Sequence, residues 1–236
     1  MSWTTEPTTD NGITERDFVI EGPGGPVPGV SWSPAGGPAD RLLLLGHGGT
    51  TDKRADYIRQ VARLAVGHGM EAVAIDGPGH GDRTLPGLTP GPDSFFEVWN
   101  QGGGTDGIVA DWRATLDFVE SQHGARPAGW WGLSMGTMMG LPVTVADDRI
   151  TVAVLGLMGR WGPNGDDLMR LAPEIGCPLR FLVQWDDEIV PRAACLELFD
   201  ALGSARKTLH ANPGVHAAVP AVEVVASVEY LDRYLD

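Results

Sequence analysis

Five short apolar runs recur along this chain, and most of them end in a glycine-rich or acidic turn. A continuous apolar run is typical of a strand that is buried on both faces of a parallel sheet. Between the runs, apolar residues recur at helical spacing, as from residue 108 to residue 119. Alternating strands and helices predict an α/β fold with a mostly parallel sheet and helices on both faces. The runs are RLLLLGHGG, EAVAIDGPGHG, AGWWGLS, RITVAVLGLM and PLRFLVQW.

The N-terminal part departs from this alternation. Residues 1–13 are mostly polar, and we expect a flexible N-terminus followed by a single domain over residues 14–236. The stretches ITERDFVI and VPGVSWSP flank a Gly/Pro turn, which predicts an antiparallel hairpin. Further along, Pro142 falls inside an expected helix, so we expect a kink or an early end there.

Composition limits the classes of partner. The chain has 31 acidic and 17 basic residues, a formal net charge of −14, which argues against binding nucleic acid or an anionic membrane. The first residues lack the basic and apolar regions of a signal peptide, and we expect a cytoplasmic protein. Cys177 and Cys195 are too few for a disulfide framework and are expected to be free thiols.

The stretch GWWGLSMG places Ser134 between two glycines at the end of an apolar run. In such a Gly-x-Ser-x-Gly pattern the glycines allow a sharp turn from strand to helix, which presents the serine hydroxyl above the sheet. The plainer interpretation is that Ser134 caps the following helix. The pattern alone does not distinguish a nucleophile from a cap.

A serine nucleophile needs an imidazole to accept its proton and a carboxylate to orient that imidazole. Both groups follow Ser134 in the sequence, in WDDEIVP and HANPGVH, at the expected ends of strands. Ligands bind beyond the carboxyl ends of strands in an open parallel sheet, so these groups are expected to meet. The residues alone leave Asp186, Asp187 and Glu188 open as the acid, and His210 and His216 as the base.

From about residue 14 to its end, the chain resembles the α/β-hydrolase superfamily in five motifs. These are LLLLGHGG, DGPGHGDR, GLSMG, WDDEIVP and PGVH. The last three carry a serine, an acid and a histidine, which is the order that this family uses. The resemblance implies that Ser134 is the nucleophile, Asp187 the acid and His216 the base. Asp186, Glu188, Asp166 and Asp167 are weaker candidates for the acid, and His47 and His80 are expected to brace backbone turns. The implied oxyanion hole consists of the N–H groups of Gly49 and Met135.

The resemblance is greatest to compact dienelactone-hydrolase-like enzymes and small carboxylesterases, although typical dienelactone hydrolases have a cysteine at the position of Ser134. It implies hydrolysis of a carboxylic ester or related acyl bond through an acyl-enzyme, with water as second substrate and no metal or organic cofactor. The net charge of −14 favours a neutral substrate. A thioesterase or acyltransferase is the alternative. A non-catalytic binding protein of the same fold is a more distant one.

Aromatic residues near the expected strand ends are candidates for an apolar substrate pocket. Phe95, Phe96 and Trp99 lie on the long Gly/Pro-rich connection of residues 81–104, and Trp161 and Trp185 follow two strands. The segment GRWGPNGDDLMRLAPEIG is too short for a separate cap domain, which predicts a minimal cap. We therefore expect the long connection to cover a small acyl pocket.

Overall fold

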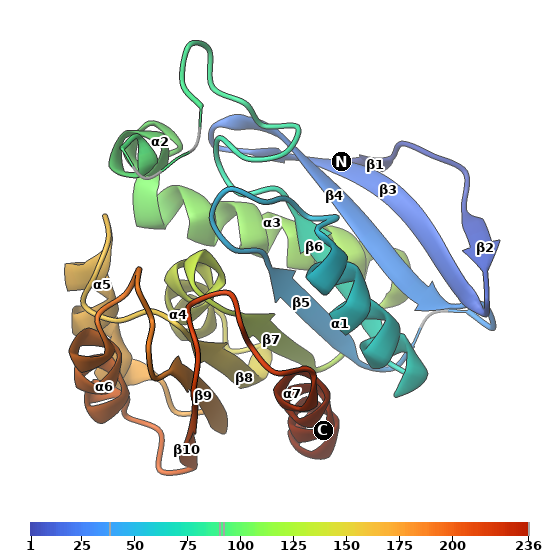
Figure 1. The fold of residues 1–236 in the computed structure, drawn as a ribbon. Helices are drawn as coiled ribbons and strands as arrows, with labels where there is room; N and C mark the ends of the chain where they lie inside the picture. The colour runs from blue at the N-terminus through green and yellow to red at the C-terminus, as the bar shows by residue number, and fades with distance from the viewer. Residues whose placement is uncertain (38, 90, 92, 236) are drawn as a thin grey trace.

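A computed structural model describes residues 1–37, 39–89, 91 and 93–235. Within these residues a ten-stranded sheet has the order β1-β3-β4-β6-β5-β7-β8-β9-β10, and β2 pairs with β3 (Figure 1). The strands are β1 (Ser2–Trp3), β2 (Thr8–Asp10), β3 (Ile13–Gly22), β4 (Gly25–Pro34), β5 (Leu42–Gly46), β6 (Glu71–Ile75), β7 (Ala128–Gly132), β8 (Ile150–Gly156), β9 (Leu179–Gln184) and β10 (Lys207–Asn212). The helices are α1 (Asp56–Gly67), α2 (Phe95–Gln101), α3 (Gly104–His123), α4 (Met135–Ala146), α5 (Gly165–Leu171), η1 (Ala172–Glu174), α6 (Arg192–Ala201) and α7 (Ala221–Tyr234).

The predicted fold class is confirmed. Strands β3 and β4 form the expected antiparallel hairpin, and β4 also runs antiparallel to β6. From β6 to β10, each neighbouring pair is parallel. The carboxyl ends of β5 to β10 consequently lie at one edge of the sheet, where loops can bring distant residues together.

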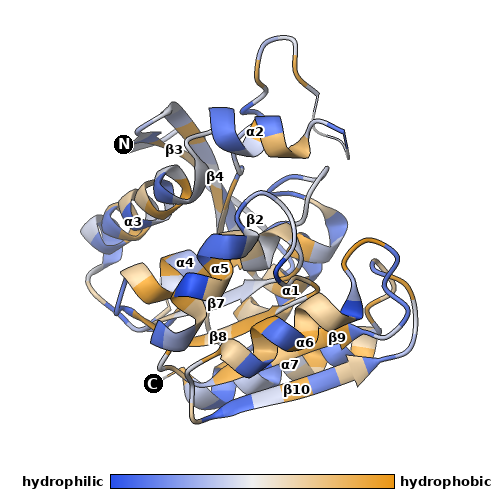
Figure 2. Cartoon of the chain, turned by 90° about the vertical axis from the view of Figure 1, so that its left-hand side faces the viewer, coloured by the Kyte–Doolittle hydropathy of each residue, from blue (hydrophilic) through white to orange (hydrophobic). Residues whose placement is uncertain are grey.

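Helices cover both faces of the sheet and bury two apolar cores. Helices α1 and α7 pack together on one face, and α3 and α4 pack together on the other. Trp130 and Trp131 are adjacent on β7, and their side chains enter the two opposite cores because side chains alternate along a strand. In Figure 2 the buried strands β8 and β9 are largely orange, whereas the outer turns of the helices are blue. None of the helices described is long and apolar enough to cross a membrane.

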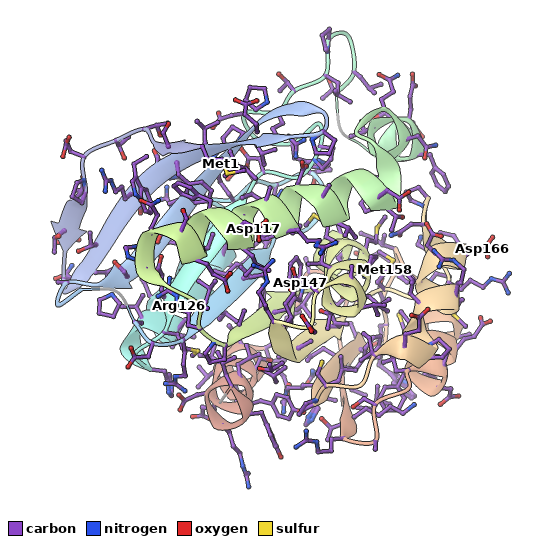
Figure 3. The ribbon with its side chains drawn as sticks, turned by 180° about the vertical axis from the view of Figure 1, so that it is seen from behind. Met1, Asp117, Arg126, Asp147, Met158 and Asp166 are labelled. Carbon is purple, nitrogen blue, oxygen red and sulfur yellow. The ribbon has the colours of Figure 1, made fainter. Side chains whose placement is uncertain are left out.

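A cluster of charges joins α3 to the end of α4. Arg149 pairs with Asp117 on α3 at 2.8 Å and with Asp147 beyond α4 at 2.5 Å. Figure 3 shows α3 crossing this side of the molecule, with Asp117 on α3 and Asp147 beside the end of α4. The hydrogen bonds to Asp147 raise the pKa of the Arg149 guanidinium above its ordinary value.

Two segments hold more regular structure than the sequence predicts. Instead of an unpaired tail, residues 2–3 and 8–10 pair with β3, and Trp3 packs edge-on against Phe18 and Phe118. The flexibility of this segment stays a prediction. The connection of residues 81–104 contains α2, and its residues 90 and 92 lie outside the described residues.

Pro142 does not end α4, so the expectation of an early end is wrong. The helix continues to Ala146. Proline at position 142 cannot donate a hydrogen bond to the carbonyl oxygen of Met138, four residues earlier. The side-chain amide of Asn164 donates to that oxygen instead, at 3.0 Å. This substitute bond explains how the helix tolerates an interior proline.

The glycines around Ser134 are required by close backbone contacts. A Cβ on Gly132 would lie 2.7 Å from the carbonyl oxygen of Gly136. A Cβ on Gly136 would overlap the carbonyl oxygen of Gly46, at the end of β5. The first turn of α4 therefore packs directly against the backbone of two strands.

We predict that Gly136→Ala lowers the free energy of unfolding by about 1–3 kcal/mol, because the added methyl group displaces α4 from β5. Gly67→Ala is the matched control, since a Cβ there, at the end of α1, meets no atom within 4 Å. The control is expected to be neutral or slightly stabilising. Urea unfolding measures both, and equal stability of the two variants would contradict the close contact.

Candidate active site

Ser134 lies between β7 and α4 in a strained backbone conformation, with φ 58° and ψ −121°. Non-glycine residues adopt positive φ at an energetic cost, which the surrounding contacts must offset. The N–H of Ser134 donates to the carbonyl oxygen of Gly156 at 2.9 Å, which fixes the turn against β8. Ser134 occupies the N-cap position of α4, but its side chain makes no capping hydrogen bond. Its hydroxyl is consequently available to another partner.

That partner is His216, in the segment between β10 and α7. The Nε2 atom of His216 lies 2.9 Å from Oγ of Ser134, and its Nδ1 atom lies 2.7 Å from Oδ2 of Asp187. The Asp187 side chain is only 1% exposed. The structure therefore joins Ser134, His216 and Asp187 in one chain of hydrogen bonds.

Three consecutive acidic residues hold the His216 segment in different ways. Only Asp187 contacts the imidazole, and its other oxygen accepts the N–H groups of Ile189 and Val190, each at 2.8 Å. Asp186 accepts the N–H of Gly214 at 3.3 Å, and Glu188 accepts the backbone N–H of His216 at 2.8 Å. The sequence motif indicates Glu188 only as an alternative to Asp187 for the acid. Its bond to the backbone depends on how the loop after β10 folds back, which no motif reveals.

The N–H groups of Gly49 and Met135 make no hydrogen bond to an acceptor within the described residues. Met135 begins α4, so its N–H lies in the first turn, where no intrahelical acceptor exists. The neighbouring N–H of Gly48 donates to the hydroxyl of Tyr57 at 2.6 Å. Of these three amides, those of Gly49 and Met135 remain free to receive an oxyanion.

His47 and His80 brace backbone turns, away from the Ser134 hydrogen-bond chain. The Nε2 atom of His47 accepts the N–H of Gly77 at 2.9 Å, and its Nδ1 donates to the carbonyl oxygen of Gly48 at 2.8 Å. Burial lowers the pKa of His47 to about 4, so this imidazole is neutral at pH 7. Burial also lowers the pKa of His80, whose Nδ1 donates to the carbonyl oxygen of Pro78 at 2.9 Å. His210 lies on β10, 3.2 Å from the Thr208 hydroxyl.

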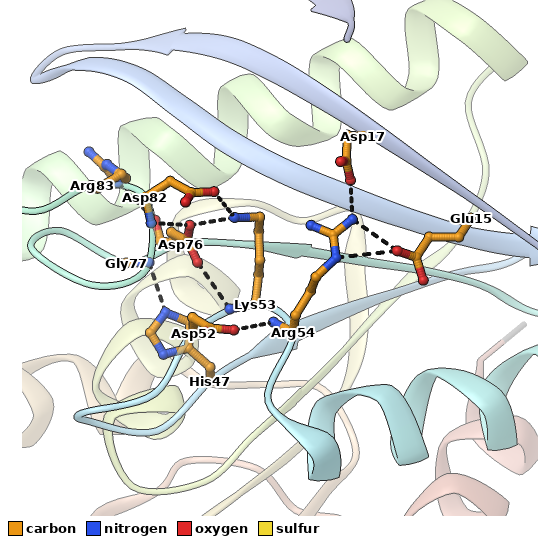
Figure 4. Close-up of polar contacts among 10 residues, drawn as sticks. All are labelled: Glu15, Asp17, His47, Asp52, Lys53, Arg54, Asp76, Gly77, Asp82 and Arg83. Atoms are coloured by element: carbon orange, nitrogen blue, oxygen red, sulfur yellow. Dashed lines mark hydrogen bonds and ion pairs between the residues drawn. The ribbon is translucent and has the colours of Figure 1, made fainter. Parts of the chain in front are cut away.

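A buried carboxylate, Asp76, connects the loop after β5 with the turn after β6 (Figure 4). Its side chain accepts the backbone N–H of Lys53 at 3.0 Å, the Lys53 ammonium at 2.6 Å and the N–H of Asp82 at 2.9 Å. Lys53 also pairs with Asp82 at 2.7 Å. Burial alone would lower the pKa of Lys53, but its bonds to Asp76 and Asp82 raise it above its ordinary value.

The neighbouring Arg54 extends this network to the hairpin. It pairs with Glu15 at 2.9 Å and with Asp17, both on β3 (Figure 4). The loop that carries Gly49 is thereby tied both to β6 and to β3. These ion pairs leave no local signal in the sequence, because the paired charges are 23 to 39 residues apart.

The five aromatic residues predicted to line the pocket occupy different places. Phe96 and Trp161 line one cavity, together with Asp166 and Asp167. Phe95 lies against Gly49, 3.6 Å from where a Cβ would be. The structure does not bring the other two aromatic residues to this cavity. Trp99 is buried in the core, and Trp185 packs under the guanidinium of Arg192, 4.1 Å from its ring centre.

Comparisons with known proteins agree with this fold. A sequence model described as the alpha/beta hydrolase family matches residues 42–234. The chain therefore belongs to the alpha/beta hydrolase family, and its predicted class, a carboxylesterase-type hydrolase, is confirmed. No curated protein sequence matches this chain.

Several solved structures are similar over nearly the whole chain. A PEG-bound complex of a cold-adapted esterase from an Arctic intertidal metagenomic library is 57% identical, with a TM-score of 0.95 and 100% of each chain covered. An acetyl xylan esterase from Paenibacillus sp. R4 is 21% identical, with a TM-score of 0.75, over 99% of this chain and 89% of that one. An esterase from Pyrococcus furiosus is 16% identical, with a TM-score of 0.72, over 94% and 93%. The structures from Paenibacillus and Pyrococcus show the fold alone. The likeness to dienelactone hydrolases stays a prediction.

Proposed function

We propose that this protein hydrolyses small, neutral carboxylic esters, with Ser134 as nucleophile, His216 as general base and Asp187 as the acid that orients it. The observation that carries the proposal is the chain of hydrogen bonds from Ser134 through His216 to Asp187. A strained backbone at Ser134 supports it, because such strain is tolerated at functional sites. The 57% identical structure is that of an esterase, which favours an oxygen ester over a thioester.

In the first half of the reaction, Ser134 Oγ forms a bond to the carbonyl carbon while His216 Nε2 takes its proton. Negative charge then develops on the carbonyl oxygen, where the N–H groups of Gly49 and Met135 stabilise it. When the tetrahedral intermediate collapses, the bond to the alcohol oxygen breaks. His216 gives its proton to that oxygen, and the alcohol leaves an acyl-enzyme on Ser134.

In the second half, water replaces the alcohol. His216 takes a proton from the water as its oxygen bonds to the acyl carbon, and a second tetrahedral intermediate forms. The bond between the acyl carbon and Ser134 Oγ then breaks, and Ser134 recovers its proton from His216. Throughout, Asp187 keeps Nδ1 protonated, so that Nε2 is the atom that exchanges protons.

The size and charge of the substrate follow from the surroundings. Between β8 and β9 the chain contains only two short helices, α5 and η1, in place of a separate cap domain. We infer that α2 is the main cover of the acyl pocket. A net charge of −14 disfavours anionic substrates. Both features support a short acyl chain on a neutral ester.

The direct experiment measures kcat/KM for p-nitrophenyl esters from acetate to palmitate. We expect a maximum at short acyl chains. Each methylene group that fits the pocket adds about 0.8 kcal/mol of favourable burial, whereas each one that does not fit adds strain. Ser134→Ala should lower kcat by about 10⁴-fold or more. Full activity in Ser134→Ala would refute the nucleophile, and a maximum at palmitate would refute the short acyl pocket.

A paired substitution tests the acid. Asp187→Asn should lower kcat by about 10⁴-fold, because asparagine favours the wrong tautomer of His216. Asp186→Asn is the matched control, since the side chain of Asp186 accepts the backbone N–H of Gly214, at 3.3 Å, and does not bond to His216 among the described residues, so it should have a far smaller effect. Steady-state kinetics on one short ester measures both. A larger loss in Asp186→Asn would show that the acid is assigned one residue out of register.

A further inference from the structure

His216 lies in a tight turn of the segment after β10. The N–H of Ala218 donates to the carbonyl oxygen of Val215 at 3.0 Å, which closes a four-residue turn with His216 at its second position. The backbone of the turn sets the direction of the Cα–Cβ bond of His216, and the side-chain torsions then have only a few favourable values. Contacts that hold this turn therefore also hold the imidazole in place.

A single buried side chain bonds to both ends of this turn. Gln184, the last residue of β9, is 1% exposed. Its Nε2 donates to the carbonyl oxygen of Ala218 at 2.8 Å and to that of Val215 at 3.2 Å, which uses both hydrogens of the amide nitrogen. The opposite orientation of the amide would set its oxygen against two carbonyl oxygens. Gln184 thus ties the turn to the end of a buried strand.

Within the described residues, the side chain of Gln184 makes hydrogen bonds to this turn alone. Its Oε1 is buried and has no partner there. The two residues before it on β9, Leu182 and Val183, are apolar and buried. Burying an amide beside them costs free energy unless hydrogen bonds offset the cost. The two bonds to the turn of His216 supply that offset.

A second side chain from the loop after β9 holds the middle of the turn. Glu188 is exposed, and its Oε2 accepts the backbone N–H of His216 at 2.8 Å. Three backbone groups of the turn are thus bound by side chains, namely the carbonyl of Val215, the N–H of His216 and the carbonyl of Ala218. Water competes with the exposed Glu188 bond more than with the buried bonds of Gln184. We therefore expect the loss of Gln184 to have the larger effect.

We propose that Gln184 and Glu188 are positioning residues that fix the turn of His216. With the turn held, the Nε2 atom of His216 stays within hydrogen-bond distance of the Ser134 hydroxyl. Both side chains act through the backbone of the turn, whereas Asp187 bonds to the imidazole directly. A catalytic group that is displaced by about 1 Å can lose roughly 10²-fold in rate. This assignment rests on the proposed ester hydrolysis and adds to it the residues that position its base.

The first test measures kcat and KM on one short p-nitrophenyl ester. Gln184→Met keeps a similar length but has no donor, and we expect kcat to fall about 10–100-fold. Because His216 acts in both halves of the reaction, KM should change less than about threefold. Gln60→Met, at an exposed position of α1, is the matched control and should keep the wild-type kcat. Glu188→Met should lower kcat about 3–10-fold, and Glu188→Gln, which keeps an acceptor oxygen, should restore it.

A second test distinguishes positioning from a general structural role. In a His216→Ala enzyme the remaining activity does not use the imidazole, so adding Gln184→Met should lower it by less than about twofold. An equal loss in both backgrounds would show that Gln184 does not act through His216, and would overturn its assignment. Urea unfolding checks that each variant is folded. The exposed Glu188 variants decide the matter if Gln184→Met does not fold.

The outcomes separate this inference from the proposed function. If Ser134→Ala or His216→Ala hydrolyses the ester as wild type does, the proposed mechanism of ester hydrolysis itself fails. If both of these variants lose activity while Gln184→Met and Glu188→Met keep the wild-type kcat, only the positioning assignment is overturned.

Discussion

The arrangement of the site depends on the buried interaction between the Asp76 carboxylate and Lys53. The carboxylate binds the backbone and the ammonium of Lys53, so the loop that carries Gly49 is fixed to the end of β6. Removing one partner of such a buried pair leaves an uncompensated charge, at a cost of about 3–5 kcal/mol. The hydrogen bond between His47 and the N–H of Gly77 fixes the same loop from another side. These two contacts set the position of the Gly49 N–H beside the turn that carries Ser134.

The strained turn at Ser134 is held by backbone packing and by the Thr137 hydroxyl, whose oxygen accepts the N–H of Gly156 at 2.7 Å and lies 3.0 Å from the carbonyl oxygen of Gly132. Gly136 lets α4 approach Gly46 on β5, and the Ser134 N–H is bound to Gly156 on β8. Strand β7 lies between these neighbours, so the sheet holds the turn from both sides. On the other side of the site, the acid turn after β9 holds the His216 segment by hydrogen bonds from three adjacent residues. The proposed nucleophile and base, Ser134 and His216, therefore come from separate loops on one sheet edge.

Local patterns in the sequence predict the strands, their parallel pairing and the position of Ser134, because glycine turns and apolar runs act over a few residues. The family resemblance adds Asp187, since the residues alone also allow Asp186 and Glu188. The sequence does not predict that Trp99 is buried, that Lys53 meets Asp76, or that Asn164 compensates for Pro142. Each of these depends on a partner distant in the chain, and only the folded structure brings the partners together.

The central claim is that Ser134 forms the covalent intermediate, and labelling with a fluorophosphonate probe tests it most directly. The probe mimics the acyl group and stays on an activated serine, so mass spectrometry of the digested protein locates the nucleophile. We predict one adduct per chain, on the peptide that contains Ser134, and none in Ser134→Ala. An adduct on another residue, or unlabelled Ser134 in a preparation that hydrolyses esters, would contradict the account.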